Sequence, residues 1–300
     1  MIEHIKFADL DLGECQRLFH GRGHAYPGLE HVNLDWLAPV LLITLYREVD
    51  NDWLKALAQD LKNKVSQCKT VLVQYRCRKL APTEIILGEE IEHTQVQELG
   101  LSYHISFGKA QNSGLFLDMR NGREWALNNA KDKKVLNLFS YTCAFSVAAI
   151  AGGAAQVVNV DLSKASLTKG RENHRLNNHL MDKVKFEAVD IFKSYGRLKK
   201  YGPYDLLICD PPSFQKGSVN IERDYSKIIR RIPQLITPGG QLMLCLNSPD
   251  LDDEFLKTEV VRECPECEFQ SKIEPPRVFK EAHQGKGLKV LLFTYLPGSA

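Results

Sequence analysis

Long apolar runs and an excess of either charge are missing from this sequence. No stretch of about 18 apolar residues occurs, so a membrane-spanning helix is not expected. The first residues also lack the apolar core of a secretory signal, which favours a cytoplasmic protein. Lys and Arg number 39 and Asp and Glu number 37, so the formal charge at pH 7 is only +2. That balance excludes a polybasic coating protein but is compatible with a local basic patch.

Paired metal-ligating motifs are missing as well. Eight cysteines are present, but they form a single CxxC motif, at 264–267, with no second CxxC and no histidine pair nearby. A zinc site or a thioredoxin-type redox site is therefore not expected, and no metal is predicted. Cys209 and Cys245 lie inside apolar runs, which predicts buried, reduced thiols.

A chain of 300 residues is long enough for one large domain or two smaller ones. We expect a small α+β domain over residues 1–110, because two short β-rich apolar runs flank an amphipathic helix. The expected strands are 39–46 and 70–75, the expected helix is 52–68, and 103–107 and 113–117 are expected to form a hairpin.

Strands and helices are expected to alternate over the second domain, residues 111–300. The predicted strands are 135–139, 156–161, 183–189, 204–209, 241–246 and 288–295, and the predicted helices are 144–151, 163–177, 222–235 and 250–261. This alternation predicts an α/β fold with a doubly wound, mostly parallel sheet. Ligands bind such sheets at the carboxyl ends of the strands, so the residues after each strand are the candidates for a site.

Glycine is missing from the segment after the first of these strands. A dinucleotide-binding fold wants glycines there, so that the backbone can approach the phosphates, and an NAD-dependent oxidoreductase is disfavoured. Small residues are present instead: Ser140, Thr142, Cys143 and Ala144. They leave room at a helix N-terminus, which favours a carboxylate group of a ligand.

Acidic residues follow the second and third strands. Asp161 lies about 20 residues after the first loop, where a carboxylate can accept hydrogen bonds from both hydroxyls of a ribose. A helix-capping aspartate that binds no ligand is an equally good interpretation. Asp190, next to the apolar Ile191, could hold the amino group and one ring face of an adenine.

The fourth strand is followed by the sharpest motif in the chain, Asp210-Pro211-Pro212-Ser213-Phe214. Two prolines after an acid at a strand end predict a rigid turn that exposes the carboxylate and the backbone carbonyls. The phenylalanine adds a flat apolar face. Such a site can hold a planar amine or a ring nitrogen and stack on the ring.

Together these features resemble the class I S-adenosylmethionine-dependent methyltransferases. The resemblance implies a seven-stranded, Rossmann-like sheet with S-adenosyl-L-methionine as cofactor, and Asp210-Pro-Pro-Ser-Phe matches their motif for nucleobase substrates. The implied cofactor-binding residues are Phe116, Asp118, Arg120, Asn137, Phe139, Ser140, Tyr141, Thr142, Cys143, Ala144, Asp161, Leu162, Ser163, Asp190, Ile191 and Asp210. The implied catalytic residues are Asp210, Pro211, Pro212, Phe214 and Asn247.

The resemblance narrows to the large-subunit rRNA methyltransferases of the RlmK and RlmI type. Its motifs are 114–120, 136–142 and 145–149, it covers roughly residues 105–300, and the small domain ahead of it also fits that type. Two positions depart from the pattern. Cys143-Ala144 stands where a glycine is usual, and Asn247 stands where the RlmI type carries the cysteine nucleophile of cytosine-C5 methylation.

The asparagine resembles the RlmK type, which implies methylation of a guanine nitrogen. A ring nitrogen already carries a lone pair, so orientation beside the methyl sulfonium supplies most of the rate. Asp210 would position the base, Phe214 would stack on it, and Cys245 is expected to be structural.

The expected partner is RNA, an rRNA or a ribosomal subunit, contacted through local basic clusters with interleaved Tyr195, Tyr201, Tyr225 and Phe279. The clusters are Lys193, Arg197, Lys199 and Lys200, then Lys216, Arg223, Lys227, Arg230 and Arg231, then Lys280, Lys286 and Lys289. Three alternatives stay open. They are a methyltransferase for a protein or small-molecule nitrogen, a cytosine-C5 RNA methyltransferase, and a non-catalytic RNA-binding assembly factor.

Overall fold

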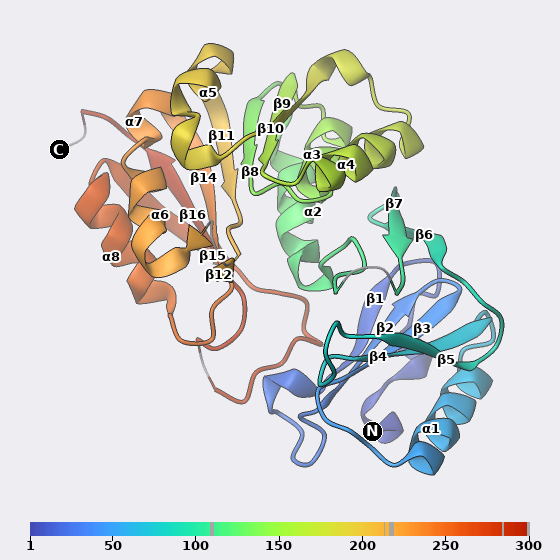
Figure 1. Ribbon diagram of the computed structural model, residues 1–300. Helices are drawn as coiled ribbons and strands as arrows, with labels where there is room; N and C mark the ends of the chain where they lie inside the picture. Colours follow the sequence, from blue (N-terminus) through green and yellow to red (C-terminus); the bar gives the residue numbers. More distant parts are fainter. Residues whose placement is uncertain (109–110, 213, 216–218, 284, 299–300) are drawn as a thin grey trace. The chain divides into compact units, whose positions relative to one another are not determined.

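The chain folds into two compact units (Figure 1). The computed structural model describes residues 1–108, 111–212, 214–215, 219–283 and 285–298. Unit 1 comprises Met1–Asp118 and Pro276–Gln284, and unit 2 comprises Met119–Pro275 and Gly285–Ala300.

The division differs from the expected boundary after residue 110 in two ways. Unit 1 continues to Asp118, and it includes the late segment Pro276–Gln284, which we expected in the second domain. Backbone hydrogen bonds explain the second difference. The N–H of Ala282 donates to the carbonyl of Gly23 (2.6 Å), and Glu281 forms an isolated β-bridge with His24.

Unit 1 is a five-stranded sheet with one long helix. The elements are β1 (Gln16–His20), β2 (Val32–Leu37), β3 (Val40–Leu45), α1 (Asn51–Lys64), β4 (Thr70–Tyr75) and β5 (Thr83–Leu87), in the sheet order β1-β2-β3-β4-β5. The predicted strand, helix and strand of the small domain are thus confirmed as β3, α1 and β4. Asp50 caps α1 by accepting a hydrogen bond from a first-turn amide, and Leu54 and Leu61 of the helix pack into the core on one face of the sheet.

The predicted hairpin was wrong in its pairing. β7 (Leu101–Ser106) pairs along its length with the preceding β6 (His93–Glu98), whereas residues 113–117 form no strand and meet β7 through the amide of Ser106, which donates to the carbonyl of Ser113 (2.9 Å). Leu99 and Gly100 connect the two strands with φ angles of 55° and 72°. Two successive left-handed residues are what a tight two-residue hairpin turn requires, so the chain reverses there.

Unit 2 holds a seven-stranded sheet, which confirms the predicted α/β architecture (Figure 1). The strands are β8 (Lys134–Leu138), β9 (Gln156–Asp161), β10 (Val184–Ala188), β11 (Tyr204–Cys209), β14 (Ile236–Leu246), β15 (Cys267–Ile273) and β16 (Lys289–Tyr295). Their order is β10-β9-β8-β11-β14-β16-β15, with the first five parallel and β16 and β15 joined in antiparallel fashion. A short ribbon, β12 (Phe214–Gln215) with β13 (Val219–Asn220), follows β11.

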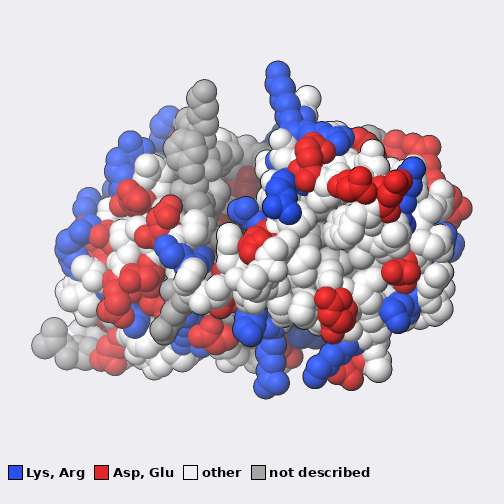
Figure 2. All heavy atoms as spheres, turned by 90° about the horizontal axis from the view of Figure 1, so that it is seen from below, with Lys and Arg blue, Asp and Glu red and all other residues white. Residues whose placement is uncertain are grey.

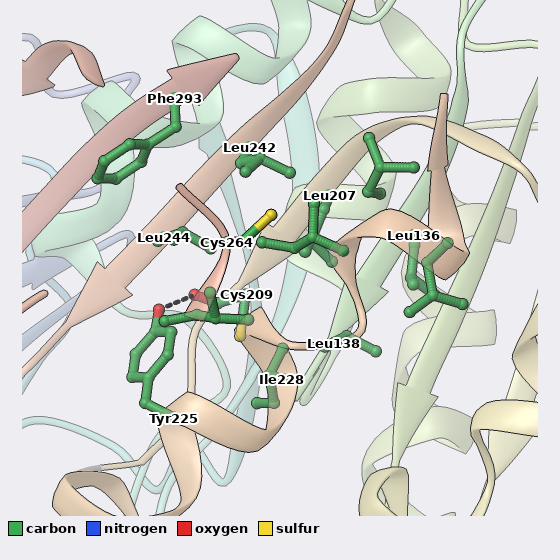
Figure 3. Close-up of a cluster of buried hydrophobic side chains, with 14 of the residues drawn as sticks. Leu136, Leu138, Leu207, Cys209, Tyr225, Ile228, Leu242, Leu244, Cys264 and Phe293 are labelled. Atoms are coloured by element: carbon green, nitrogen blue, oxygen red, sulfur yellow. Dashed lines mark hydrogen bonds between the residues drawn. The ribbon is translucent and has the colours of Figure 1, made fainter. Parts of the chain in front are cut away.

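Helices cover both faces of this sheet. They are α2 (Arg120–Asn129), α3 (Ala144–Ala151), α4 (Lys164–Leu176), α5 (Tyr195–Tyr201), α6 (Ile221–Ile229), α7 (Ile232–Leu235) and α8 (Asp253–Glu263). One buried cluster joins the sheet to α5, α6, α7 and α8, and Figure 3 shows part of it; a second joins the other face to α2 and α3. Because both faces are buried, the central strands read as continuous apolar runs. No helix in the described residues is long and apolar enough to cross a membrane.

Candidate cofactor and substrate site

Polar residues stand at the carboxyl ends of the five parallel strands of unit 2. Ser140 follows β8, Asp161 ends β9, Asp190 follows β10, Asp210 follows β11 and Asn247 follows β14. Parallel strands all end at the same edge of a sheet, so these residues share one rim. Since β8 lies between β9 and β11, the loop after β8 is flanked by the ends that carry Asp161 and Asp210.

The loop after β8 takes a glycine-like course without glycine. Phe139, Tyr141 and Cys143 have φ angles of 57°, 46° and 62°, all in the left-handed region. Each such non-glycine residue costs on the order of 1 kcal/mol or more, and persists only where neighbouring contacts hold it. The amide of Tyr141 donates to Asp161 Oδ2 (2.8 Å) and that of Cys143 to the carbonyl of Ser140 (2.7 Å). The missing glycine therefore does not prevent a tight loop.

A glycine on the neighbouring helix compensates for the cysteine in this loop. A Cβ atom built on Gly170 of α4 would lie only 2.4 Å from Cys143 Sγ. The glycine thus makes room for the fully buried thiol. Asn173, one turn later on α4, donates from Nδ2 to the carbonyl of Thr142 (3.0 Å), and Ala144 begins α3. The predicted loop residues are therefore fixed from the α4 side.

Asp161 ties the ends of two strands together. Its Oδ2 accepts the amide of Tyr141 and its Oδ1 accepts the amide of Ser163 (2.8 Å each). A carboxylate has about four lone-pair positions, so it can also accept a ribose hydroxyl. Leu162 next to it is 56% exposed, so its side chain is available to the apolar face of a ligand.

Ser163 and Asp190 both act as helix caps. Ser163 Oγ accepts the amide of Ser166 at the start of α4 (3.1 Å). Asp190 Oδ1 accepts the amide of Phe192 (2.9 Å), and Lys193 Nζ lies 3.5 Å from its Oδ2. Ile191 is buried in the core between sheet and helices, and its contact with adenine stays a prediction.

The side chain of Asn137 is buried and forms its hydrogen bond inside unit 2. Its Nδ2 donates to Asn159 Oδ1 (2.9 Å), and Asn159 Nδ2 donates to Ser146 Oγ (2.9 Å). Ser146 Oγ also contacts Nε2 of His174 (2.8 Å). The other ring nitrogen of His174, Nδ1, lies 2.9 Å from Nδ1 of His179. Burial lowers the pKa of His174 to about 3, so the imidazole is neutral. This buried chain, which the sequence pattern did not reveal, joins β8, β9, α3 and α4.

The Asp210-Pro-Pro turn is anchored by a helix. The amide of Asp210 contacts the carbonyl of Leu138 (3.5 Å), Pro211 is buried and Pro212 is partly buried. Tyr225 of α6 donates its hydroxyl to the carbonyl of Cys209 (3.3 Å; Figure 3). The same hydroxyl contacts the carbonyl of Cys245 (3.0 Å), so one buried side chain joins the ends of β11 and β14.

Tyr225 was expected to stack on RNA, and burial shows that expectation to be wrong. The side chain of Phe214 lies outside the described residues, although its backbone belongs to β12.

Asn247 is exposed immediately after β14. The next residue, Ser248, is held by Lys289 of β16, whose Nζ donates to its carbonyl. Lys289 is buried, so its expected role in a surface cluster for RNA was wrong. Cys245 is fully buried in the strand, which confirms the prediction that this thiol is structural.

The expected cofactor residues Phe116, Asp118 and Arg120 are divided between the two units. Phe116 and Asp118 belong to unit 1, whereas Arg120 begins α2 of unit 2. Phe116 is 41% exposed, and Arg120 pairs with Glu124 one helical turn later (3.7 Å).

Five of the basic residues expected to meet RNA in unit 2 are paired with acids, namely Lys193, Arg197, Arg223, Lys227 and Arg230. Arg223 and Lys227 both contact Asp224 (3.0 and 2.8 Å), and Arg230 pairs with Glu263. The hydrogen bond from Arg223 holds the pKa of Asp224 well below its ordinary value. Figure 2 likewise shows Lys and Arg side chains interspersed with Asp and Glu on the face it presents. Lys216 lies outside the described residues.

The rim of unit 2 fits a nucleoside carrying a carboxylate. Ser140 Oγ is buried and has no hydrogen-bond partner among the described residues, an arrangement that proteins generally avoid unless a ligand completes it. Beside it are the tight loop at a helix start, the carboxylate of Asp161 and the exposed Leu162. These groups suit, in turn, a carboxylate, a ribose and an adenine face.

Comparison with known proteins decides the family. The S-adenosylmethionine-dependent methyltransferase family matches residues 16–294. The chain belongs to this family. Membership confirms the predicted fold class, the predicted methyltransferase class and S-adenosylmethionine as the cofactor of this methyltransferase.

The relatives include ribosomal RNA methyltransferases. The ribosomal RNA large subunit methyltransferase K/L of Pseudoalteromonas translucida (strain TAC 125) is 36% identical over 157 residues, covering 51% of this methyltransferase and 22% of that protein. The ribosomal RNA large subunit methyltransferase I of Aliivibrio fischeri (strain MJ11) is 34% identical over 166 residues, covering 54% and 42%. The match thus spans less than half of either relative. A methyltransferase crystallised with SAH has a TM-score of 0.86 at 26% identity, covering 96% of this chain and 77% of that one.

Proposed function

We propose that this methyltransferase transfers a methyl group to a base nitrogen of rRNA, with guanine as the favoured base. The names of its relatives support rRNA as the substrate class. The observation that carries the proposal is the position of Asn247 and the Asp210-Pro-Pro turn at the ends of the neighbouring strands β14 and β11.

Among the described residues, no exposed thiol lies at the strand ends that form the rim of unit 2, and this disfavours methylation at cytosine C5. That reaction needs a cysteine thiolate that adds to the ring. Asn247 occupies the position expected for that cysteine. Cys245 and Cys209 are fully buried in the sheet, and burial raises the pKa of the Cys209 thiol. A nitrogen nucleophile needs no covalent help, which suits the groups at this rim.

The residues of the rim bind and orient the base. S-adenosylmethionine, when bound, supplies an electrophilic methyl group. The carboxylate of Asp210 can accept an N–H of the base and hold the proton that the nitrogen releases, and the amide of Asn247 can both donate to and accept from the base edge. Tyr225 keeps the two strand ends in register, because one hydroxyl contacts both carbonyls. Proximity then accounts for most of the rate.

The decisive experiment is transfer of labelled methyl groups to rRNA from a strain that lacks this protein. Naked rRNA, ribosomal subunits and whole ribosomes are compared as substrates, and the product is digested to nucleosides. We expect the label in a methylated guanosine.

Three results would contradict the proposal. Label in 5-methylcytidine, with a trapped protein–RNA adduct, would support the cytosine-C5 reaction. Label in protein or in a small molecule would move the substrate class to those nitrogens. Absence of S-adenosylmethionine binding at millimolar concentration, measured by calorimetry, would favour a non-catalytic assembly factor.

A further inference from the structure

The sheet of unit 1 brings two arginines and a tyrosine to one end. β1, β3 and β4 run in the same direction, because β2 is antiparallel to β1 and β3 whereas β4 is parallel to β3. Their carboxyl ends therefore lie at the same end of the sheet. Arg22, Tyr46 and Arg76 follow these three ends within two residues of each.

Neutral groups hold the two arginines in place. Arg22 Cζ lies 4.2 Å from the centroid of the Tyr46 ring. Arg76 is half-buried; it donates from Nε to Gln74 Oε1 and from Nη2 to Asn112 Oδ1 (3.0 Å each). A guanidinium has five N–H donors, so these contacts leave several donors for a ligand.

Neither arginine pairs with a carboxylate in the part of the chain that the structure describes. Nearby arginines differ. Arg78 is tied to Glu48 and Glu84 (2.7 and 2.9 Å), and Arg17 is paired with Asp35. Burial lowers the pKa of Arg76, Tyr46 acts in the opposite direction, and the charge of Arg22 again lowers the pKa. Two positive charges therefore lie close together without compensation, which is the electrostatic condition for binding an anion.

The chemistry of the three side chains selects the anion. A guanidinium matches two oxygens of a phosphate with its planar fork. An aromatic ring beside it offers a face for a base, and arginine with tyrosine is a common platform for single-stranded RNA. We propose that Arg22, Tyr46 and Arg76 bind phosphate groups of an RNA strand. This proposal rests on the proposed function for the identity of the nucleic acid as the rRNA substrate.

The test measures binding of a labelled single-stranded RNA by the full chain across a salt series. Arg22→Gln, Arg76→Gln and the double variant remove the proposed contacts. Arg78→Gln is the matched control. Arg78 lies two residues after Arg76 and carries the same charge, but it is already paired with Glu48 and Glu84. We expect the double variant to lose roughly tenfold in affinity at low salt, with the control close to wild type. The slope of log K against log salt should fall by about 0.7 for each arginine removed.

Conservative variants and a competitor make the test stricter. Arg22→Lys with Arg76→Lys keeps both charges, so the salt slope should return to the wild-type value. Inorganic phosphate should compete better than chloride at equal ionic strength, because it offers the oxygens that a guanidinium fork matches. The proposal is overturned if the glutamine variants keep the wild-type slope, if Arg78→Gln changes it equally, or if inorganic phosphate competes no better than chloride.

Failure here is distinguishable from failure of the proposed function. Wild-type methylation of guanosine with an unchanged salt slope in the double variant would overturn the phosphate site alone. A reduced slope together with methyl transfer to a protein would overturn the proposed function alone. Calorimetry with S-adenosylmethionine should give wild-type affinity for every arginine variant, and circular dichroism checks that each variant is folded.

Discussion

The two units of this methyltransferase place their unpaired positive charges differently. In unit 2, Arg197 is paired with Glu187 (2.7 Å) and Arg262 with Glu259, whereas Arg231 lies over the ring of Tyr195 without a carboxylate partner among the described residues. In unit 1, Arg22 and Arg76 have only neutral partners in the described structure. The comparison teaches that a net charge of +2 says little about where a polyanion binds. What matters is which positive charges the fold leaves without a carboxylate.

The largest expected effect is the fall in kcat caused by Asp210→Ala. It tests whether methyl transfer depends on the strand-end rim of unit 2. Loss of the group that orients the base should lower kcat by about 100-fold or more, because misplacement of about 1 Å already has that effect. RNA affinity and its salt slope should stay unchanged. Single-turnover methyl transfer and RNA binding measure the two quantities, with the exposed Asp182→Asn as control. Normal kcat would show that the turn is only structural.

Gly170→Ala tests how the glycine-free loop is supported. The new Cβ would collide with Cys143 Sγ, and such overpacking destabilises a protein by about 1–3 kcal/mol. Cys143→Ala should relieve the collision, so the double variant should recover most of the loss. Urea unfolding of the four proteins gives the coupling energy. Additive losses would mean that the two positions do not support one another.

Asp161→Ala should weaken S-adenosylmethionine binding and leave unit 1 unaffected. Hydrogen bonds to a charged group contribute about 1.5–3 kcal/mol, which corresponds to at least about a tenfold rise in Kd. Part of that loss comes through the amide of Tyr141, which the carboxylate now holds. Calorimetry measures the affinity. An unchanged Kd would show that Asp161 only fixes the loop and the start of the helix and does not bind the cofactor. A lowered salt slope for RNA would show that unit 2 also contributes to phosphate binding.

The smallest expected effect is on acid stability, and it occurs in both units. Burial lowers the pKa of His20 in unit 1 and of His174 in unit 2 to about 3. Each histidine therefore stays unprotonated in the folded state at a pH where the unfolded chain binds a proton. The free energy of unfolding falls as the pH drops below 6.5 and does not change above it. Relative to alkaline pH, the loss reaches about 1.4 kcal/mol per histidine at pH 5.5. His20→Gln and His174→Gln should flatten the curve, and a loss of stability towards alkaline pH would contradict the sign.

Much of unit 2 was predictable because its strands are apolar on both faces. The segments that became β8, β9 and β11 were predicted to within one residue at each end, whereas β14 begins at Ile236, five residues before its predicted start. β15 was missed, because as an edge strand it carries Glu268, Gln270 and Ser271 on exposed positions. In unit 1, β2 was missed because Asn33 and Asp35 interrupt its apolar pattern, although both are buried.

The site was predictable only in part. Asp161 and Asp210 were found because each is an acid at the end of a strand, a local pattern along the chain. Gly170 acts through its contact with Cys143, which lies 27 positions earlier in the chain. Lys289 acts through its hydrogen bond to Ser248, which lies 41 positions earlier. No periodicity or motif records such a contact, since it depends on how strands and helices pack.

The sequence by itself determined the alternation of strands and helices, and with it which residues end the parallel strands. Those features follow from local propensity and from burial of both faces of a sheet. Only the tertiary structure decided that three non-glycine residues after β8 take left-handed conformations, because Gly170 and Asp161 hold that loop from other elements. It also decided which arginines lack a carboxylate partner, since ion pairing depends on distances between side chains and not on their number.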